Sequence, residues 1–113
     1  MTRATSFIRT LAAAAALIAT GAASADVNIG VIVSLTGPGA SLGIPADNTI
    51  KLWPAELGGQ KINLIVLNDA TDTTTAAKNA TKLITEDKVD VIIGPSLTPT
   101  SLAVIDVAAR SGV

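Results

Sequence analysis

Apolar positions along the chain follow two different spacings. Three short runs are dense in Val, Ile and Leu and are bounded by Gly, Asn, Asp or Pro: Val27–Leu35, Lys61–Asp69 and Val89–Ile93. Their apolar residues are nearly continuous rather than strictly alternating with polar ones. Such runs predict strands that are buried on both faces of a sheet.

The segment after the first run has helical spacing. We expect a loop over Thr36–Gly43 and then one helix over Ile44–Leu57. Pro45 is tolerated there because the first turn of a helix does not need its N–H. Pro54 should end or kink the helix near Trp53, because the residue before a proline avoids the helical conformation.

Two more helices are expected further along. Asp72 or Thr71 is a good N-cap for the second, and Thr98 starts the third. The second helix has one apolar stripe, formed by Ala76, Ala77, Ala80, Leu83 and Ile84. Strands and helices therefore alternate three times, which predicts an α/β fold with a parallel sheet between two helical layers. A flavodoxin-like strand order, 2-1-3, would place the first and third strands side by side.

The first 25 residues have the pattern of a secretory signal peptide. Arg3 and Arg9 make a basic start, Leu11–Ala19 is an unbroken apolar run, and Ala23–Ala25 is a small-x-small cleavage site. A transmembrane anchor is the alternative, but the apolar run is shorter than the roughly 20 residues that span a bilayer. We therefore expect export to the periplasm and a mature chain that begins at Asp26.

Composition narrows the possible functions of residues 26–113. They carry six basic and nine acidic side chains, so their net charge is −3, without a basic cluster. Nucleic acid and anionic membranes are poor partners for such a chain. The sequence has no Cys and no His, which excludes disulfides, argues against a zinc site and removes the commonest general base. We expect no metal, no cofactor and no enzymatic activity.

The loops that follow the first and third strands are the candidate ligand site. In open parallel sheets, ligands bind beyond the C-terminal ends of the strands, where helices leave neighbouring strands on opposite faces. Here those loops are Ser34–Gly43 and Gly94–Thr98. With Thr98 as N-cap, the amides of Thr100 and Ser101 would be free to bind a carboxylate, because a helix N-terminus attracts anions. Alternatively, these residues only cap a helix and turn the chain, and the pattern leaves both interpretations open.

Other features of the chain resemble known kinds of binding or catalytic site but lack residues that such a site needs. The loop Thr36–Gly43 resembles a phosphate loop but lacks the Gly-Lys-Ser/Thr ending. Asp69 ends the second strand as a phospho-acceptor would, but we expect a solvated carboxylate or turn former there. We also expect Asp47 and Asn48 to face water and Trp53 to pack rather than to bind a ligand.

Two long segments resemble a known family. They are IGVIVSLTGPGASLGIPADNTIKL, at Ile29–Leu52, and LIVLNDATDTTTAAKNATKLITEDKVDVIIGPSLTPTSLAVIDVA, at Leu64–Ala108. Together they are similar to the periplasmic solute-binding proteins of branched-chain amino acid ABC transporters, the leucine/isoleucine/valine-binding protein family. The segment between them, WPAELGGQK at Trp53–Lys61, is shorter than the insertion common in that family. It resembles a subgroup whose ligands include aromatic carboxylates.

The resemblance implies a type I periplasmic-binding fold, in which two α/β lobes close on a small ligand. Residues 26–113 would supply the first part of lobe 1. In the family, the loops after the first and third strands contact the ligand, which implies five ligand-binding residues here: Ser41, Leu42, Ser96, Leu97 and Thr98. The position of Leu42 often holds an aromatic residue in amino-acid binders, so its leucine also favours a different carboxylate.

The resemblance implies a substrate-binding component of an ABC importer. It would capture a small carboxylate-bearing ligand, either a branched-chain amino acid or an aromatic carboxylate, and deliver it to a membrane permease. An extracytoplasmic receptor domain of the same fold is the alternative function. A flavodoxin-like or nucleotide-dependent enzyme is a third, and the missing His, Cys and phosphate loop count against it.

Overall fold

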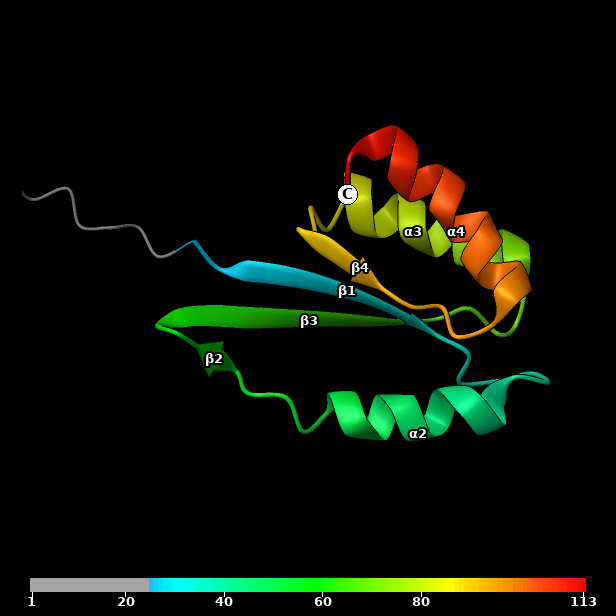
Figure 1. Ribbon diagram of the computed structural model, residues 1–113, viewed down its shortest axis with the longest axis horizontal. Coiled ribbons are helices and arrows are strands. Elements are labelled where there is room, and N and C mark those ends of the chain that lie inside the picture. The colour runs from blue at the N-terminus through cyan, green and yellow to red at the C-terminus, as the bar shows by residue number, and fades with distance from the viewer. Residues whose placement is uncertain (1–24) are drawn as a thin grey trace, which may run out of the picture.

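The computed structural model describes residues 25–113 (Figure 1). The predicted signal peptide and its apolar run therefore lie outside the described residues. Among residues 25–113, no helix is long and apolar enough to cross a membrane. The elements follow in the order β1 (Val27–Val33), α2 (Ala40–Ile50), β2 (Glu56–Leu57), β3 (Gln60–Asn68), α3 (Thr73–Thr85), β4 (Val91–Ile93) and α4 (Thr98–Ser111).

The sheet has the order β2-β3-β1-β4. Strands β3 and β4 are both parallel to β1, with Val31 of β1 opposite Val66 on one side and Ile93 on the other. The predicted strands therefore adopt the predicted 2-1-3 order, and the α/β fold class is confirmed. The sheet is mixed rather than purely parallel, because β2 pairs with the start of β3 in the antiparallel direction.

Helices cover both faces of this sheet, as Figure 1 shows: α3 and α4 lie on one side and α2 on the other. Ile32 of β1 points into the first layer and is fully buried. Its cluster also contains Ala76, Ala80, Leu83, Val89 and Val104. Val31 and Val33 point to the opposite face, where they pack with Ile50 of α2. Successive β1 side chains thus fill two separate cores, which explains why this run is apolar throughout.

The first helix differs from the prediction. It covers Ala40–Ile50 rather than Ile44–Leu57, so the residues ASLG belong to its first turn and not to the preceding loop. Pro45 therefore lies inside the helix, one turn further than expected. Gly43 contributes to the early start because it packs directly on the backbone of Ser34, where an added Cβ would overlap the Ser34 carbonyl oxygen.

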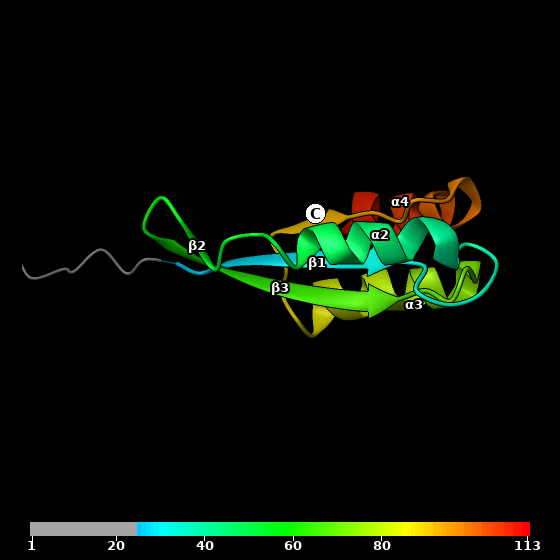
Figure 2. The ribbon, with the colours of Figure 1, turned by 90° about the horizontal axis from the view of Figure 1, so that it is seen from below.

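The residues after α2 form a hairpin and not a helix. Gly58 and Gly59 both have positive φ, 60° and 80°, which only glycine adopts readily and which makes a tight turn between β2 and β3. Pro54 lies just before β2. Figure 2 shows this hairpin beyond the C-terminal end of α2. The apolar residues Leu52, Trp53 and Leu57 of the predicted helix are exposed to solvent, so no buried face holds this segment in a helix.

The starts of the other two helices differ from each other. Asp72 is the N-cap of α3, as predicted, and its side chain accepts a hydrogen bond from the Thr75 amide. The N-cap of α4 is Leu97, so Thr98 is the first helical residue and not the predicted cap. Pro99 then occupies the second position, where the missing N–H costs no helical hydrogen bond.

Candidate functional site

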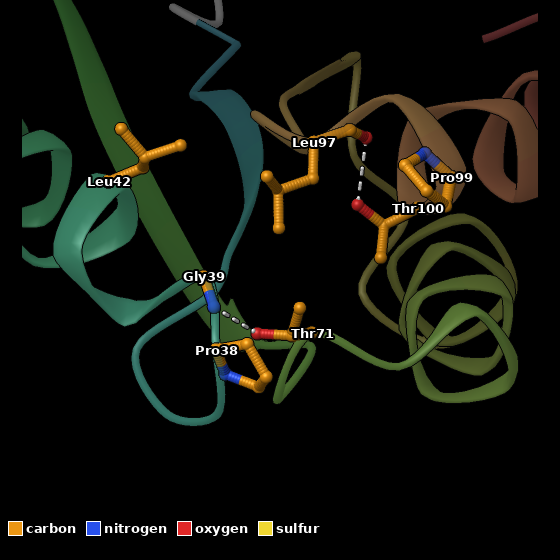
Figure 3. A pocket seen from close by; sticks show the side chains of 7 residues that line it. All are labelled: Pro38, Gly39, Leu42, Thr71, Leu97, Pro99 and Thr100. Carbon is orange, nitrogen blue, oxygen red and sulfur yellow. Dashed lines mark hydrogen bonds between the residues drawn. The ribbon is translucent and has the colours of Figure 1, made fainter.

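The starts of α2 and α4 lie at the same end of the sheet, beyond the C-terminal ends of β1 and β4 (Figure 1). A pocket of about 280 Å³ lies between these two helix starts (Figure 3). Its lining is mostly apolar. It comes from the start of α2, the turn after β3 and the start of α4: Pro38, Gly39, Leu42, Thr71, Leu97, Pro99 and Thr100. This is the edge of the sheet at which the strand order predicts a ligand crevice.

Both helix starts at the pocket lack a capping side chain. The N-caps are Gly39 for α2 and Leu97 for α4, and neither makes a side-chain cap hydrogen bond. Among the described residues, the amides of Ser41, Thr98 and Thr100 have no hydrogen-bond acceptor. Such amides, together with the positive end of each helix dipole, favour an anionic group. The pocket thus combines apolar walls with free donors next to it.

Of the five residues that the resemblance implied, Leu42 and Leu97 line the pocket. Leu42 is 55% exposed on the first turn of α2, and Leu97 extends into the pocket from the opposite side (Figure 3). Ser41, Ser96 and Thr98 lie next to these two leucines along the chain, are exposed, and do not line the pocket with their side chains. Any contact they make with a ligand in this pocket would come from their backbone.

The predicted free amide of Ser101 is wrong. Its N–H donates to the Leu97 carbonyl over 2.9 Å, because Leu97 and not Thr98 is the N-cap. The Ser101 hydroxyl donates to the Pro95 carbonyl over 2.7 Å. The free donors of α4 are therefore one position closer to the loop than the sequence predicted, at Thr98 and Thr100.

Thr71, Thr100, Pro38 and Gly39 line the pocket but were not among the predicted site residues. Thr71 follows β3, whose C-terminal end was not considered part of the site. Its hydroxyl accepts a hydrogen bond from the Gly39 amide at 3.0 Å (Figure 3). The partners are 32 positions apart, so no local pattern reveals the contact. The Thr100 hydroxyl donates to the Leu97 carbonyl at 3.0 Å.

Asp69 forms a turn, as one of the two predicted alternatives stated, because its side chain accepts from the Thr71 amide and its carbonyl accepts from the Asp72 amide. The other alternative, a solvated carboxylate, is wrong. The Asp69 side chain is completely buried and not solvated. One carboxylate oxygen, Oδ1, accepts hydrogen bonds from the Ser34 hydroxyl at 2.7 Å and from the Thr71 amide at 2.8 Å. A strand-end Asp that is held by two protein donors acts as an internal anchor. Asp47 is likewise largely buried and forms an ion pair with Lys51 at 2.6 Å, so the expectation that it faces water is wrong.

The start of α3 lies at the same edge but is closed by its own side chain. Asp72 Oδ1 accepts from the Thr75 amide at 2.7 Å and from the Thr75 hydroxyl at 2.8 Å. These hydrogen bonds, the backbone one first, hold the pKa of Asp72 below its usual range, because they stabilise the charged carboxylate. This helix start therefore differs from the starts of α2 and α4 in having a side-chain cap on one of its amides.

The chemistry available at the pocket is binding. None of the side chains that line it titrates near neutral pH, and residues 25–113 contain no group of three or more metal-ligating side chains. The two lining hydroxyls, of Thr71 and Thr100, donate to backbone carbonyls. A nucleophile needs a neighbouring base, and no residue of this pocket supplies one.

The chain is similar to known proteins over most of its length. Residues 26–113 match the family described as periplasmic binding protein. The chain is 31% identical over 97 residues to the Leu/Ile/Val-binding protein BraC3 of Rhizobium johnstonii, a match that covers 80% of this chain and 26% of that protein.

Two solved structures are similar to the fold. One is an extracellular ligand-binding receptor from Rhodopseudomonas palustris HaA2, with 50% identity, a TM-score of 0.74, and coverage of 77% of this chain and 24% of that one. The other is the solute-binding protein of an ABC transporter from Rhodopseudomonas palustris BisB5, in complex with 3,4-dihydroxybenzoic acid. It has 37% identity, a TM-score of 0.74, and coverage of 78% and 25%. The chain thus spans about a quarter of the length of these relatives.

Proposed function

Because this chain belongs to the periplasmic binding protein family, we propose that it is the extracytoplasmic substrate-binding component of an ABC importer. Relatives of this kind bind substrates rather than transform them. In this proposal residues 1–25 are a cleaved signal peptide, the protein acts in the periplasm, and a membrane permease receives the ligand. Residues 26–113 form the first part of one lobe, and closure of two lobes by a hinge traps the ligand.

The proposed ligand is a small molecule with one carboxylate and an apolar body. The observation that carries this proposal is the meeting of two helix starts without side-chain caps at one apolar pocket. The amides of Thr98 and Thr100 bind the carboxylate, with the Ser41 amide on the opposite side. Leu42 and Leu97 contact the apolar body, and Ser96 contributes its backbone carbonyl.

The ligand class has two members in this proposal, a branched-chain amino acid and an aromatic carboxylate. The first is supported by the Leu/Ile/Val-binding relative, and the second by the relative that holds 3,4-dihydroxybenzoic acid. The lining residues of this pocket include no acidic side chain that could pair with an ammonium group. An aromatic carboxylate needs no such partner, and both ligand classes have the carboxylate that the helix amides of this pocket would bind.

Calorimetric titration tests the proposal. The protein, expressed from its own gene and purified after export, is titrated with leucine, isoleucine, benzoate and 3,4-dihydroxybenzoate. Each ligand is matched with its primary amide, which lacks the carboxylate charge. We expect at least one carboxylate to bind with one-to-one stoichiometry and its amide to bind far more weakly, because the helix amides favour an anion. Failure of all four carboxylates to bind, or equal binding of an amide, would contradict it.

A sensory receptor domain is the second candidate, since a relative with 50% identity is described as an extracellular ligand-binding receptor. The two functions differ in what happens after binding. Deletion of the gene should abolish uptake of the labelled ligand if the protein serves an importer. Normal uptake together with loss of a ligand-dependent transcriptional response would favour the receptor.

A further inference from the structure

We propose that the turn after β3 is a clasp that positions one wall of the ligand pocket, and that Thr71 is its positioning residue. The clasp consists of Asn68, Asp69 and Thr71, and it holds the loop Ser34–Gly39 that leads into α2. The role of the pocket as a ligand site rests on the proposed function. The clasp itself is defined by hydrogen bonds within the chain.

Thr71 holds the end of that loop. Its hydroxyl oxygen accepts from the Gly39 amide at 3.0 Å, and its hydroxyl proton is donated to the Thr36 carbonyl, also at 3.0 Å. Gly39 is the N-cap of α2, so this contact fixes the point at which the helix begins. Because its only proton is already donated, the Thr71 hydroxyl cannot donate to an anionic ligand. It lines the pocket and acts on the ligand through Gly39.

Asp69 and Asn68 hold the beginning of the same loop. The buried Asp69 carboxylate accepts from the Ser34 hydroxyl and from the Thr71 amide, so it links the loop to the clasp. Asn68 Oδ1 accepts from the Leu35 amide at 2.9 Å, and its Nδ2 donates to the Thr36 hydroxyl at 2.9 Å. Every side chain of the clasp thus has a partner in the loop before α2.

The backbone of the clasp is held in a conformation that its residues disfavour. Ala70 and Thr71 have positive φ, 52° and 62°, and a β-branched residue such as Thr rarely adopts this region. Such strain persists only where surrounding contacts enforce it, and here the Asp69 carboxylate accepts from the Thr71 amide. Strain of this kind is concentrated at functional sites.

The loop is packed tightly enough to transmit a displacement. A Cβ added at Gly37 would lie 2.6 Å from the Ala70 carbonyl oxygen, and one added at Gly39 would lie 3.0 Å from Thr71 Oγ1 and overlap the Leu97 side chain. Gly39 is therefore in contact with the clasp on one side and with a pocket-lining leucine of α4 on the other. A change in the Thr71 hydrogen bond moves the wall of the pocket that Gly39 and Leu42 form.

The test compares Thr71→Val, which preserves shape and branching but removes both hydrogen bonds, with Thr71→Ser, which keeps the hydroxyl. Thr81→Val is the matched control, because Thr81 is an exposed threonine of α3 whose hydroxyl bonds only to the Ala77 carbonyl. The first readout is hydrogen exchange of the Gly39 amide, measured by NMR without ligand. The second is the affinity for the carboxylate that binds the unaltered protein best.

We expect Thr71→Val to speed exchange at Gly39 by about tenfold and to weaken the ligand by about tenfold, because the amide loses its acceptor and the helix start its position. Thr71→Ser should restore both values, and Thr81→Val should change neither. Unchanged exchange at Gly39 in Thr71→Val would overturn the clasp. Faster exchange with unchanged affinity would overturn its role in the pocket. If the unaltered protein binds no carboxylate, the proposed function fails, and the exchange readout still decides whether the clasp exists.

Discussion

The helices α3 and α4 are similar in length, leave the same edge of one sheet and pack on the same face, yet they begin in different ways. The start of α3 is capped by the Asp72 side chain. The start of α4 has Leu97 at the N-cap and no side-chain cap. An apolar N-cap forgoes about 1 kcal/mol of helix stability relative to Asp or Asn. This loss of helix stability occurs at the helix start that faces the pocket.

The same contrast applies to α2, whose N-cap is Gly39 and whose first turn also faces the pocket. We call a helix start closed where a side chain caps it and open where none does. Of the three helices that the structure describes, α2 and α4 at the pocket have open starts, and α3 has a closed start. The capping residue thus distinguishes a helix start that its own side chain stabilises from one whose backbone amides can bind a ligand. Four substitutions test this comparison.

The largest effect should come from Gly43→Ala, which displaces the open start of α2. Its new Cβ would overlap the Ser34 carbonyl oxygen, and backbone cannot move aside as a side chain can. We expect a loss of about 3 kcal/mol in the free energy of unfolding, measured by denaturant titration. Asn48→Ala, on the exposed side of the same helix, is the control and should cost far less. Equal values for the two variants would show that the start of α2 is not held against β1.

The next effect should come from giving α4 the closed start that α3 has. Leu97→Asn supplies a side-chain oxygen for the Thr100 amide, and Leu97→Ala removes the same apolar contact without supplying a cap. We expect the Asn variant to be about 1 kcal/mol more stable than the Ala variant and to bind the carboxylate about tenfold more weakly. Calorimetry and denaturant titration measure the two quantities. Equal affinities would mean that the free amides of α4 do not bind the ligand.

A smaller effect should follow from altering the closed start of α3. The Thr75 amide lowers the pKa of Asp72 below its ordinary value of 3.8, so near that pH the unfolded chain binds more protons than the folded one. The contribution of Asp72 is therefore fully present above about pH 4 and is lost as the pH falls through the lower folded pKa.

Asp72→Asn should keep a side-chain cap but remove the part of the pH dependence of stability that comes from Asp72. Denaturant midpoints measured between about pH 2 and 5 would show this change. Ligand affinity at neutral pH should be unchanged, since Asp72 does not line the pocket. An acid profile identical to that of the unaltered protein would contradict the cap. A weaker ligand would contradict the separation of the two kinds of helix start.

The smallest effect should come from Thr98→Ala. Within residues 25–113 the Thr98 hydroxyl has no hydrogen-bond partner, and the substitution leaves the backbone amide in place. Stability should change by less than about 0.5 kcal/mol and ligand affinity by less than about twofold. A tenfold loss of affinity would mean that the hydroxyl itself binds the ligand.

The sequence predicts strands β1, β3 and β4, their order and two leucines of the pocket, because each follows from apolar spacing or from a family resemblance. It does not predict the start of α2, since Gly39 carries no capping signal and Pro45 normally marks a first turn. The role of Thr71 was missed for a different reason. Its contact with Gly39 joins two loops that become neighbours only after β1 and β3 have paired.

The turn at Asp69 was predicted, but the alternative of a solvated carboxylate failed, because position in the chain alone does not determine burial. An Asp at the end of a strand usually turns the chain in water. Here the Ser34 hydroxyl and the Thr71 amide donate to Oδ1 of the buried carboxylate, while Oδ2 is buried without a hydrogen-bond partner among the described residues. The sequence places both donor residues in loops, where polar residues are expected. It therefore gives no sign that the two donors meet at one carboxylate.

Strand β4 forms one edge of the described sheet, and its outer side has no neighbouring strand among residues 25–113. Val91 and Ile93 on this strand are 42% and 38% exposed, and Leu102 and Ile105 of α4 are exposed as well. An apolar edge of this kind recruits strands from other molecules. Concentrated preparations of residues 25–113 are therefore expected to self-associate, and a lysine introduced at Val91 should raise their solubility limit.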